Sequence, residues 1–474
     1  MRIFKKIKEQ PEGVKASFAY FFASVVNSGI AYITMPIFTR LLTADQFGKV
    51  SVYQTWESVL GIIAMFCLSS GVFNNGMIDY KDDRDVYSFS LLVLSNIITI
   101  VFAFVFLCVY HWFPNIFGFS LPLVFVMFLC FFLQPAYNFW MARQRYEFKY
   151  KKLSLIMISV AILAPLCAIV GLLKIKGNPV NIRIITGKIP FILLYVVIYI
   201  YIIKKAHGHL KIAYWKSAFL FNLPLIPHYL SSLLLNSCDK IMISYMVGDS
   251  ATAYYSVAHS VAAIATIVWS AANSSLIPYT YEKCEKKEYK AISKVTLPLL
   301  FLFGIACCLI ILLAPEVVAV MATKDYQEAI YVIPPIVGGV FFQVQYFIYA
   351  NIIYYFKKPR YVMYASVTSM MLNLILNYLF INKYGYLAAG YTTLICYFIQ
   401  ATLDYIGLKK VLKTPVYNMR VIGMLSLLMI LISIISVILY RYNSLIRYVI
   451  LFACAIISYV NRKKIIMIIR FKRN

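Results

Sequence analysis

Long apolar stretches dominate the chain. Fourteen of them approach or exceed the roughly 20 residues that a helix needs to cross a hydrocarbon core of about 30 Å. The predicted spans are 16–39, 50–73, 88–110, 119–140, 153–173, 188–203, 218–246, 253–278, 295–315, 328–356, 361–381, 387–408, 421–440 and 445–460. Only short connectors lie between them, so nothing remains from which to build a separate soluble domain. The pattern predicts an all-α, polytopic integral membrane protein with about 14 transmembrane helices.

The charge balance supports this topology. The chain has 45 basic and 18 acidic residues and a net charge of +27, which in a soluble protein would suggest a nucleic-acid partner. When the predicted segments alternate from a cytoplasmic N-terminus, 34 of the 45 basic residues fall on the cytoplasmic side and 10 on the outer side. The positive-inside rule then predicts that both termini are cytoplasmic. The basic residues therefore set the orientation, and no nucleic-acid partner is expected.

A weak internal repeat divides the chain. A shift of 205 residues places 41–52 on 246–257, in both cases at an outer turn between the first two spans of a half. Span 1 then matches span 7, so the repeating unit has six spans and keeps its membrane orientation. Such parallel repeats are common in transporters. We predict two six-helix bundles, 1–217 and 218–420, followed by two extra helices and a basic tail in 421–474.

Three stretches carry a resemblance to a known family. They are MPIFTRLL at 35–42, NSCDKIMISY at 236–245 and LNLILN at 372–377. In this order, and over nearly the whole chain, they resemble the polysaccharide (Wzx-type, O-antigen) flippases of the multidrug/oligosaccharidyl-lipid/polysaccharide exporter superfamily. The resemblance implies a protein that moves undecaprenyl-pyrophosphate-linked oligosaccharide to the outer leaflet by alternating access.

The resemblance also implies where the protein works and with what. It implies the bacterial plasma (inner) membrane, a role in surface polysaccharide such as lipopolysaccharide, coupling to H⁺ or Na⁺, and glycan polymerase and chain-length proteins as partners. Two alternatives stay open: a small-molecule exporter of the multidrug type, and a membrane-embedded glycan polymerase or glycosyltransferase. The chain has no G-x-x-x-x-G-K-[ST] or G-x-S-x-G motif and no metal-ligand spacing, so neither an enzyme nor a cofactor is predicted.

Acids at membrane depth are the first candidate functional residues, because they cost several kcal/mol unless they face water or a partner. Asp239 in span 7 and Glu57 in span 2 are predicted to couple an ion. Asp404, near the cytoplasmic end of span 12, is interpreted as a solvated helix end. Pro36 in span 1 is a candidate hinge, and Pro224 occupies span 7 in a similar way.

Polar side chains of four spans are candidates for sugar contact or cavity lining. On span 7, His228 and Asn236 share a stripe with Asp239. The others are Asn27 on span 1, Gln343 on span 10, and Asn373 and Asn377 on span 11. Amides are equally suited to hydrogen bonds between helices, so this alternative stays open.

A pyrophosphate needs cations, and arginine suits its planar, bidentate recognition. Away from the cytoplasmic segments, the candidates are Arg40, Lys240, Arg183 and Lys188, in that order. For each of them, an anchor at the membrane interface is the alternative.

Overall fold

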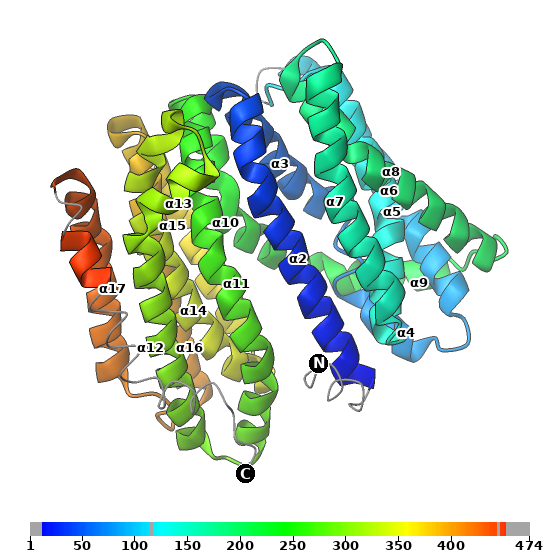
Figure 1. The fold of residues 1–474 in the computed structure, drawn as a ribbon. Helices are drawn as coiled ribbons and strands as arrows, with labels where there is room; N and C mark the ends of the chain where they lie inside the picture. Colours follow the sequence, from blue (N-terminus) through cyan, green and yellow to red (C-terminus); the bar gives the residue numbers. More distant parts are fainter. Residues whose placement is uncertain (1–11, 114–116, 443–445, 452–474) are drawn as a thin grey trace, which may run out of the picture. The chain divides into compact units, whose positions relative to one another are not determined.

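The computed structural model describes residues 12–113, 117–442 and 446–451, and this part of the chain contains helices and no strands (Figure 1). The first half holds α2 (Glu12–Leu41), α3 (Ala44–Ala64), α4 (Val72–Asp79), α5 (Arg84–Trp112), α6 (Leu121–Tyr146), α7 (Tyr150–Lys174), α8 (Pro179–Lys205) and α9 (Ala213–Asn222). The second half holds α10 (Ile226–Met246), α11 (Asp249–Glu285), α12 (Tyr289–Leu312), α13 (Ala314–Met321), α14 (Ile333–Tyr355), α15 (Arg360–Tyr384), α16 (Tyr386–Val411) and α17 (Met419–Tyr442). Short 3₁₀ helices cover Leu223–Leu225 and Lys324–Tyr331.

The predicted fold class is confirmed. Among the described residues, 11 helices are long and apolar enough to cross a membrane. Two further predicted spans correspond to the long helices α3 and α16. The last predicted span, 445–460, and the basic tail lie largely outside the described residues. The chain is thus a multi-pass, all-α membrane protein.

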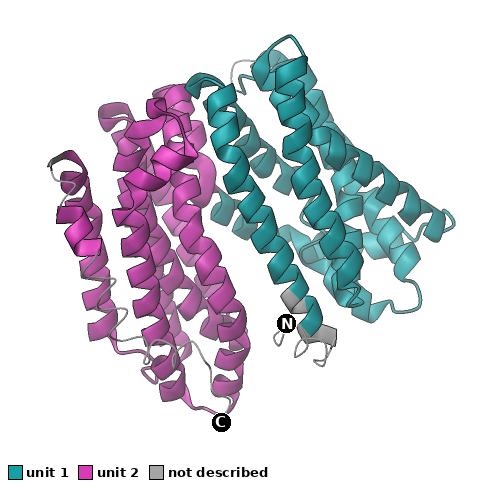
Figure 2. Cartoon of the chain, viewed as in Figure 1, with its two compact units in different colours: residues 1–233 teal, residues 234–474 magenta. Residues whose placement is uncertain are grey.

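The chain forms two compact units, residues 1–233 and 234–474 (Figure 2). In unit 1, α8 packs against α3, α6 and α7, and α7 also packs against α2. In unit 2, α14 is the central helix and contacts α11, α12, α16 and α17. The most apolar window of α14 is 83% buried, which explains why this helix is apolar on all sides.

The second predicted span, 50–73, is wrong as one continuous helix. The α3 helix ends at Ala64, Phe66 (φ 54°) and Cys67 (φ 48°) take left-handed conformations, and α4 begins at Val72. Left-handed backbone at non-glycine residues cannot continue an α-helix. The apolar run continued past residue 64, so hydropathy alone did not reveal the break.

The seventh predicted span is also interrupted, by the 3₁₀ turn Leu223–Leu225 that contains Pro224. Proline removes a backbone donor and clashes with the preceding turn, which explains the interruption. By contrast, α2 continues through Pro36 without a break.

Asn222 joins these two interruptions inside unit 1. It is 1% exposed, its Oδ1 accepts a hydrogen bond from the Val72 amide at 3.3 Å, and its Nδ2 donates to the Phe66 carbonyl at 3.1 Å. A Cβ on Gly71 would lie 3.0 Å from the same Oδ1. One amide side chain thereby satisfies backbone groups that the broken helix leaves free.

Two local features at helix ends have clear causes. The α3 helix begins with a capping box: Thr43 Oγ1 accepts from the Gln46 amide, and Gln46 Oε1 accepts from the Thr43 amide. Before α5, the Asp83 carboxylate accepts from the Lys211 ammonium and, at 3.1 Å, from the Tyr214 hydroxyl. These bonds, the one from Lys211 above all, lower the pKa of Asp83, and the bond to Asp83 raises the pKa of Lys211.

Candidate functional site

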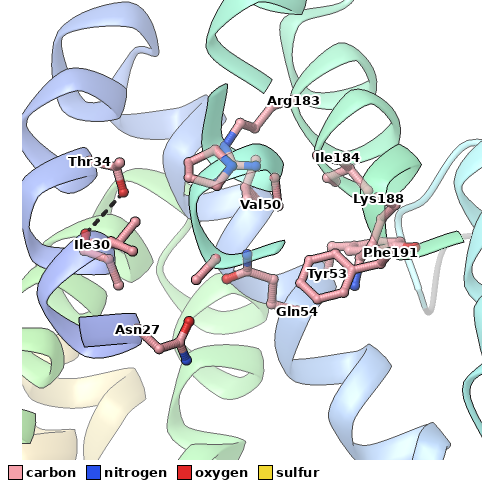
Figure 3. A pocket seen from close by; sticks show the side chains of 15 residues that line it. Asn27, Ile30, Thr34, Val50, Tyr53, Gln54, Arg183, Ile184, Lys188 and Phe191 are labelled. Atoms are coloured by element: carbon pink, nitrogen blue, oxygen red, sulfur yellow. Dashed lines mark hydrogen bonds between the residues drawn. The ribbon is translucent and has the colours of Figure 1, made fainter. Parts of the chain in front are cut away.

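Unit 1 contains a cavity of about 240 Å³ between α2, α3, α7 and α8. Polar side chains line it from three of these helices: Asn27 from α2, Gln54 from α3, and Arg183 and Lys188 from α8 (Figure 3). Three of the four belong to the residues predicted to contact substrate. The remaining wall is mostly aliphatic and aromatic, so these few polar groups determine which ligand atoms fit.

Arg183 is the cation of this cavity that has no acidic partner among the described residues. Its guanidinium lies 3.8 Å from the centre of the Phe38 ring, a cation–π contact. A Cβ at Gly187, one turn later on α8, would lie only 2.8 Å from Arg183 Nη1. Glycine at this position therefore leaves room for the guanidinium beside the helix.

Lys188 and Glu57 form an ion pair, which sequence reasoning did not foresee. Lys188 Nζ lies 2.6 and 2.7 Å from the two carboxylate oxygens of Glu57, and the side chains are 26% and 13% exposed. Both residues line a second cavity of about 400 Å³, together with Gln134 and Asn138 of α6. Since Lys188 also lines the first cavity, it borders both. The pair is neutral as a unit, so the positive charge of the first cavity comes from Arg183.

Unit 2 encloses a fully buried network around Asp239 of α10. The carboxylate accepts hydrogen bonds from the Tyr255 hydroxyl of α11, from Thr393 Oγ1 of α16 at 2.7 Å and from Asn377 Nδ2 of α15 at 2.6 Å. Asn377 also donates to Asn373 Oδ1 at 3.1 Å. All five residues are buried, and four helices contribute to the cluster.

A smaller cluster lies one turn away on α10. Asn236 Oδ1 accepts from Gln343 Nε2 of α14 at 3.2 Å and from the Tyr397 hydroxyl of α16 at 2.5 Å. Asn236, Gln343, Asn373 and Asn377 thus all make hydrogen bonds between helices, as the alternative interpretation of these amides expected.

Three predicted site residues lie outside these groups. Arg40 is exposed in the last turn of α2, and Lys240 follows Asp239 on α10 and is partly buried. His228 lies on α10 within unit 1, and its Nδ1 is buried without a hydrogen-bond partner among the described residues. None of the three lines the cavity that Arg183 borders.

The interpretation of Asp404 as a solvated helix end is wrong. Asp404 is 0% exposed, and neither carboxylate oxygen has a hydrogen-bond partner within the described part of the chain. Sequence reasoning also did not single out Thr393 and Tyr397 as site residues. A signal was available, because Thr393, Tyr397 and Asp404 recur at helical spacing on one face of α16.

Together, the helices, the polar cavity of unit 1 and the buried acid of unit 2 define a multi-pass membrane protein with a polar interior. Comparisons with known proteins identify its family. The model of the polysaccharide biosynthesis protein family matches residues 14–283, more than half of the 474 residues, so the chain belongs to this family. A second model, MatE, matches residues 224–379. The resemblance that the three sequence motifs indicated is therefore confirmed.

Individual relatives and solved structures are similar to the chain over different lengths. A protein of the Lsg locus of Haemophilus influenzae is 24% identical over 154 residues, which cover 32% of this chain and 38% of that relative. The chain thus matches well under half the length of this curated relative. The structure of the lipid II flippase MurJ in an inward closed conformation is similar, with a TM-score of 0.63 and 16% identity, over 95% of this chain and 100% of that one. A Vibrio cholerae MATE transporter, VcmN, matches with a TM-score of 0.58 and 11% identity, over 85% and 97% of the two chains. The chain shares the fold of both.

Proposed function

We propose that this protein is a flippase that moves a lipid-linked oligosaccharide, carried on undecaprenyl pyrophosphate, from the inner to the outer leaflet of the bacterial plasma membrane. The family is one of polysaccharide biosynthesis, and the fold is that of a lipid II flippase. Alternating access of the cavity to the two leaflets would carry the polar headgroup past the hydrocarbon core. The product would pass to a glycan polymerase and chain-length proteins on the outer side.

The observation that carries the proposal is Arg183 in the cavity of unit 1. A pyrophosphate brings two or more negative charges, and an arginine without an acidic partner can neutralise charge and donate two parallel hydrogen bonds. The neighbouring Glu57–Lys188 pair would give a second cation if a ligand phosphate displaced the carboxylate. We assign the pyrophosphate contact first to Arg183 and next to Lys188. Arg40 and Lys240 do not line this cavity and follow as candidates outside it.

Sugar contact in this proposal falls to the amides that line the cavity. Asn27 and Gln54 present amide groups there, and each can donate to and accept from sugar hydroxyls. Asn373 and Asn377 are 0% exposed and bonded to the Asp239 network, so we assign them to that network instead.

We assign ion coupling to Asp239. A buried carboxylate surrounded by amide and hydroxyl groups is a suitable ligand for H⁺ or Na⁺, and its three donors come from three other helices. Binding or release of a cation would therefore alter contacts among α10, α11, α15 and α16. Glu57 is the second candidate, and its ion pair with Lys188 makes its charge dependent on the cavity of unit 1.

A second candidate function is small-molecule export, which the MatE match over 224–379 and the structural similarity to a MATE transporter favour. An exporter of cationic drugs needs acid that is free to pair with its substrate. Arg183 in the first cavity of unit 1 has no acidic partner among the described residues, and Glu57, which lines the second cavity, is paired with Lys188, so an anionic substrate fits better.

Deletion of the gene tests the proposal. We expect lipid-linked glycan to accumulate on the cytoplasmic leaflet and surface glycan to be lost, as measured by leaflet-specific labelling. The wild-type gene should restore export, Arg183→Ala should not, and Arg360→Ala, which removes an exposed arginine at the start of α15, should behave as wild type. Unchanged surface glycan in the deletion strain would contradict the proposal.

A further inference from the structure

The carboxyl group of Asp404 on α16 is buried without a partner. The residue is 0% exposed, and both side-chain oxygens lack a hydrogen-bond donor among the described residues. A negative charge left in this way inside an apolar helical bundle is strongly unfavourable, so a native protein normally pairs it or neutralises it. No ion pair of the described residues includes Asp404, so its charge has to be removed in another way.

Gln400 supplies the complementary group. Its Oε1 atom is also buried and also lacks a donor among the described residues. Gln400 precedes Asp404 by four residues on the same helix, a spacing that brings side chains together. A proton on Asp404 removes the charge and turns one carboxyl oxygen into a donor for Gln400 Oε1. One proton therefore satisfies two groups that are otherwise left unbonded.

These two residues end a polar stripe on α16. At 100° per residue, Thr393, Tyr397, Gln400 and Asp404 fall within an arc of about 60° and extend over about 16 Å of helix. Thr393 donates to Asp239, and Tyr397 donates to Asn236. The stripe thus runs from the Asp239 network to the end of α16 that the charge distribution assigns to the cytoplasmic side.

None of the described titratable groups near Asp404 bonds to its carboxyl group. A bound proton is therefore the simplest way to neutralise its charge. From α14, Tyr346 and Tyr349 lie close enough to interact with it electrostatically. On α16 itself, the Lys409 ammonium lies 4.8 Å from the centre of the Tyr405 ring, and on α15 the Arg360 guanidinium lies 5.3 Å from that of Tyr361. On α11, at the other end of the stripe, the Tyr255 hydroxyl donates to Asp239, and the His259 ring lies one turn further with its centre 6.5 Å from that of Tyr255.

A metal ion fits less well. Asp404 and Gln400 together offer three oxygen atoms, fewer than the roughly six or more that Ca²⁺ and Mg²⁺ take. A proton needs one carboxyl oxygen and one acceptor, and both are present.

We propose that Asp404 is a proton-binding site at the cytoplasmic end of this stripe, distinct from the Asp239 network. The site exchanges one proton with the cytoplasm, and Gln400 holds it by accepting the hydrogen bond. That this proton drives transport rests on the proposed flippase function. The existence of the site does not.

Infrared spectroscopy of the purified full-length protein in lipid nanodiscs tests the site directly, because a protonated carboxyl has a C=O stretching band that a carboxylate lacks. At neutral pH we expect such a band in the wild type and its loss in Asp404→Asn. Asp325→Asn, which changes an exposed acid in the same unit, should keep it. Gln400→Leu should shift the band, since the carboxyl loses its acceptor. If Asp404→Asn does not fold, Asp404→Glu should keep the band at a displaced frequency.

Two results would overturn the proposal. One is a wild-type spectrum identical to that of Asp404→Asn at every pH, which means an ionised Asp404. The other is a band that appears only when choline replaces Na⁺, which means that a metal cation occupies the site. A band that behaves as expected in a protein that moves no lipid-linked glycan would reject the flippase and keep the proton site.

Discussion

Unit 1 and unit 2 bury ionisable side chains in contrasting ways. In unit 1, Lys188 and Glu57 neutralise each other at the border of two cavities and stay 26% and 13% exposed. In unit 2, Asp239 is 0% exposed and its carboxylate accepts hydrogen bonds from three neutral donors. The first arrangement can exchange partners with a large anion. The second can exchange only something as small as a proton or a monovalent ion.

The contrast indicates that the two units have different tasks in transport. A headgroup with a pyrophosphate requires volume and cations, which the cavity of unit 1 provides. An ion that interacts with several helices at once requires a buried site between them, which the Asp239 network of unit 2 provides. Substitutions in the two regions should therefore separate effects on stability from effects on transport. The following four predictions are ordered by their expected effect on the free energy of unfolding.

The largest effect is expected from Asp239→Ala. This change leaves the Tyr255 and Thr393 hydroxyls as buried donors without their acceptor and removes one of the two acceptors of Asn377 Nδ2, so we expect the free energy of unfolding to fall by about 2 kcal/mol or more. The measurement is denaturant unfolding of purified protein in detergent. Asp325→Ala, at an exposed acid of the same unit, is the control and should stay within about 0.5 kcal/mol of the wild type. Equal stability of the two variants would show that the hydrogen bonds of Asp239 do not stabilise unit 2.

A smaller effect is expected from the ion pair of unit 1. A double-mutant cycle with Glu57→Gln and Lys188→Met should give a coupling free energy of about 1 kcal/mol, because the pair is partly reached by water. The same unfolding measurement provides the four values of the cycle. Strictly additive single effects would show that the two charges do not depend on each other, and Lys188 would then be available to a ligand without displacing Glu57.

Arg183→Ala should cost less stability still, about 0.5–1 kcal/mol, since it removes one cation–π contact with Phe38. Its effect on transport should be large, with flipping of lipid-linked glycan in reconstituted vesicles reduced at least about tenfold, the effect of 1.4 kcal/mol on an equilibrium. Arg183→Lys should fall between the wild type and Arg183→Ala, because it keeps the charge without the bidentate geometry. Full transport by the alanine variant would leave the cavity without its proposed role.

The smallest effect concerns Asp83 and Lys211, outside the predicted spans. Because the pKa of Asp83 is lowered on folding, its stabilisation is present above its unfolded value of about 4 and is lost as the pH falls through the folded value. Because the pKa of Lys211 is raised, its stabilisation is present below about 10.4 and is lost as the pH rises through the folded value. The difference in Tm between wild type and Asp83→Asn should be constant between these limits and shrink beyond them. A difference in Tm that reaches a maximum at one pH between these limits would contradict the pairing of Asp83 with Lys211.

Most of the helices could be predicted from the sequence because hydrophobic length is a direct requirement of the bilayer. The interruptions could not. Residues 65–68 remain apolar, and the left-handed Phe66 and Cys67 end the helix before Ser69 and Ser70 are reached. The signal for the start of α3 was present, as Thr43 and Gln46 stand at capping-box spacing.

The sequence named Asn27, Arg183 and Lys188, which line the first cavity, but it did not predict how the candidate residues pair. Glu57 and Lys188 were assigned to different roles, and 131 residues separate them, so one sequence carries no sign that they touch. Asp239 and Asn377 are 138 residues apart and were likewise assigned to an ion and to sugar. Asp404 was misinterpreted because its position near a helix end suggested water, and burial there depends on how α14 and α15 pack against α16.

The contact that Asn222 makes with Val72 and Phe66 has a consequence for evolution. Residues 150 apart in the chain share one hydrogen-bonded junction, and Gly71 leaves little space there, since a Cβ at this position would lie 3.0 Å from Asn222 Oδ1. A change at position 222 therefore alters the surroundings of the residues around 71. Across homologous proteins, position 222 and the residues around 71 should covary. Such covariation would show that the two helix interruptions are constrained together, even where the apolar residues around them vary.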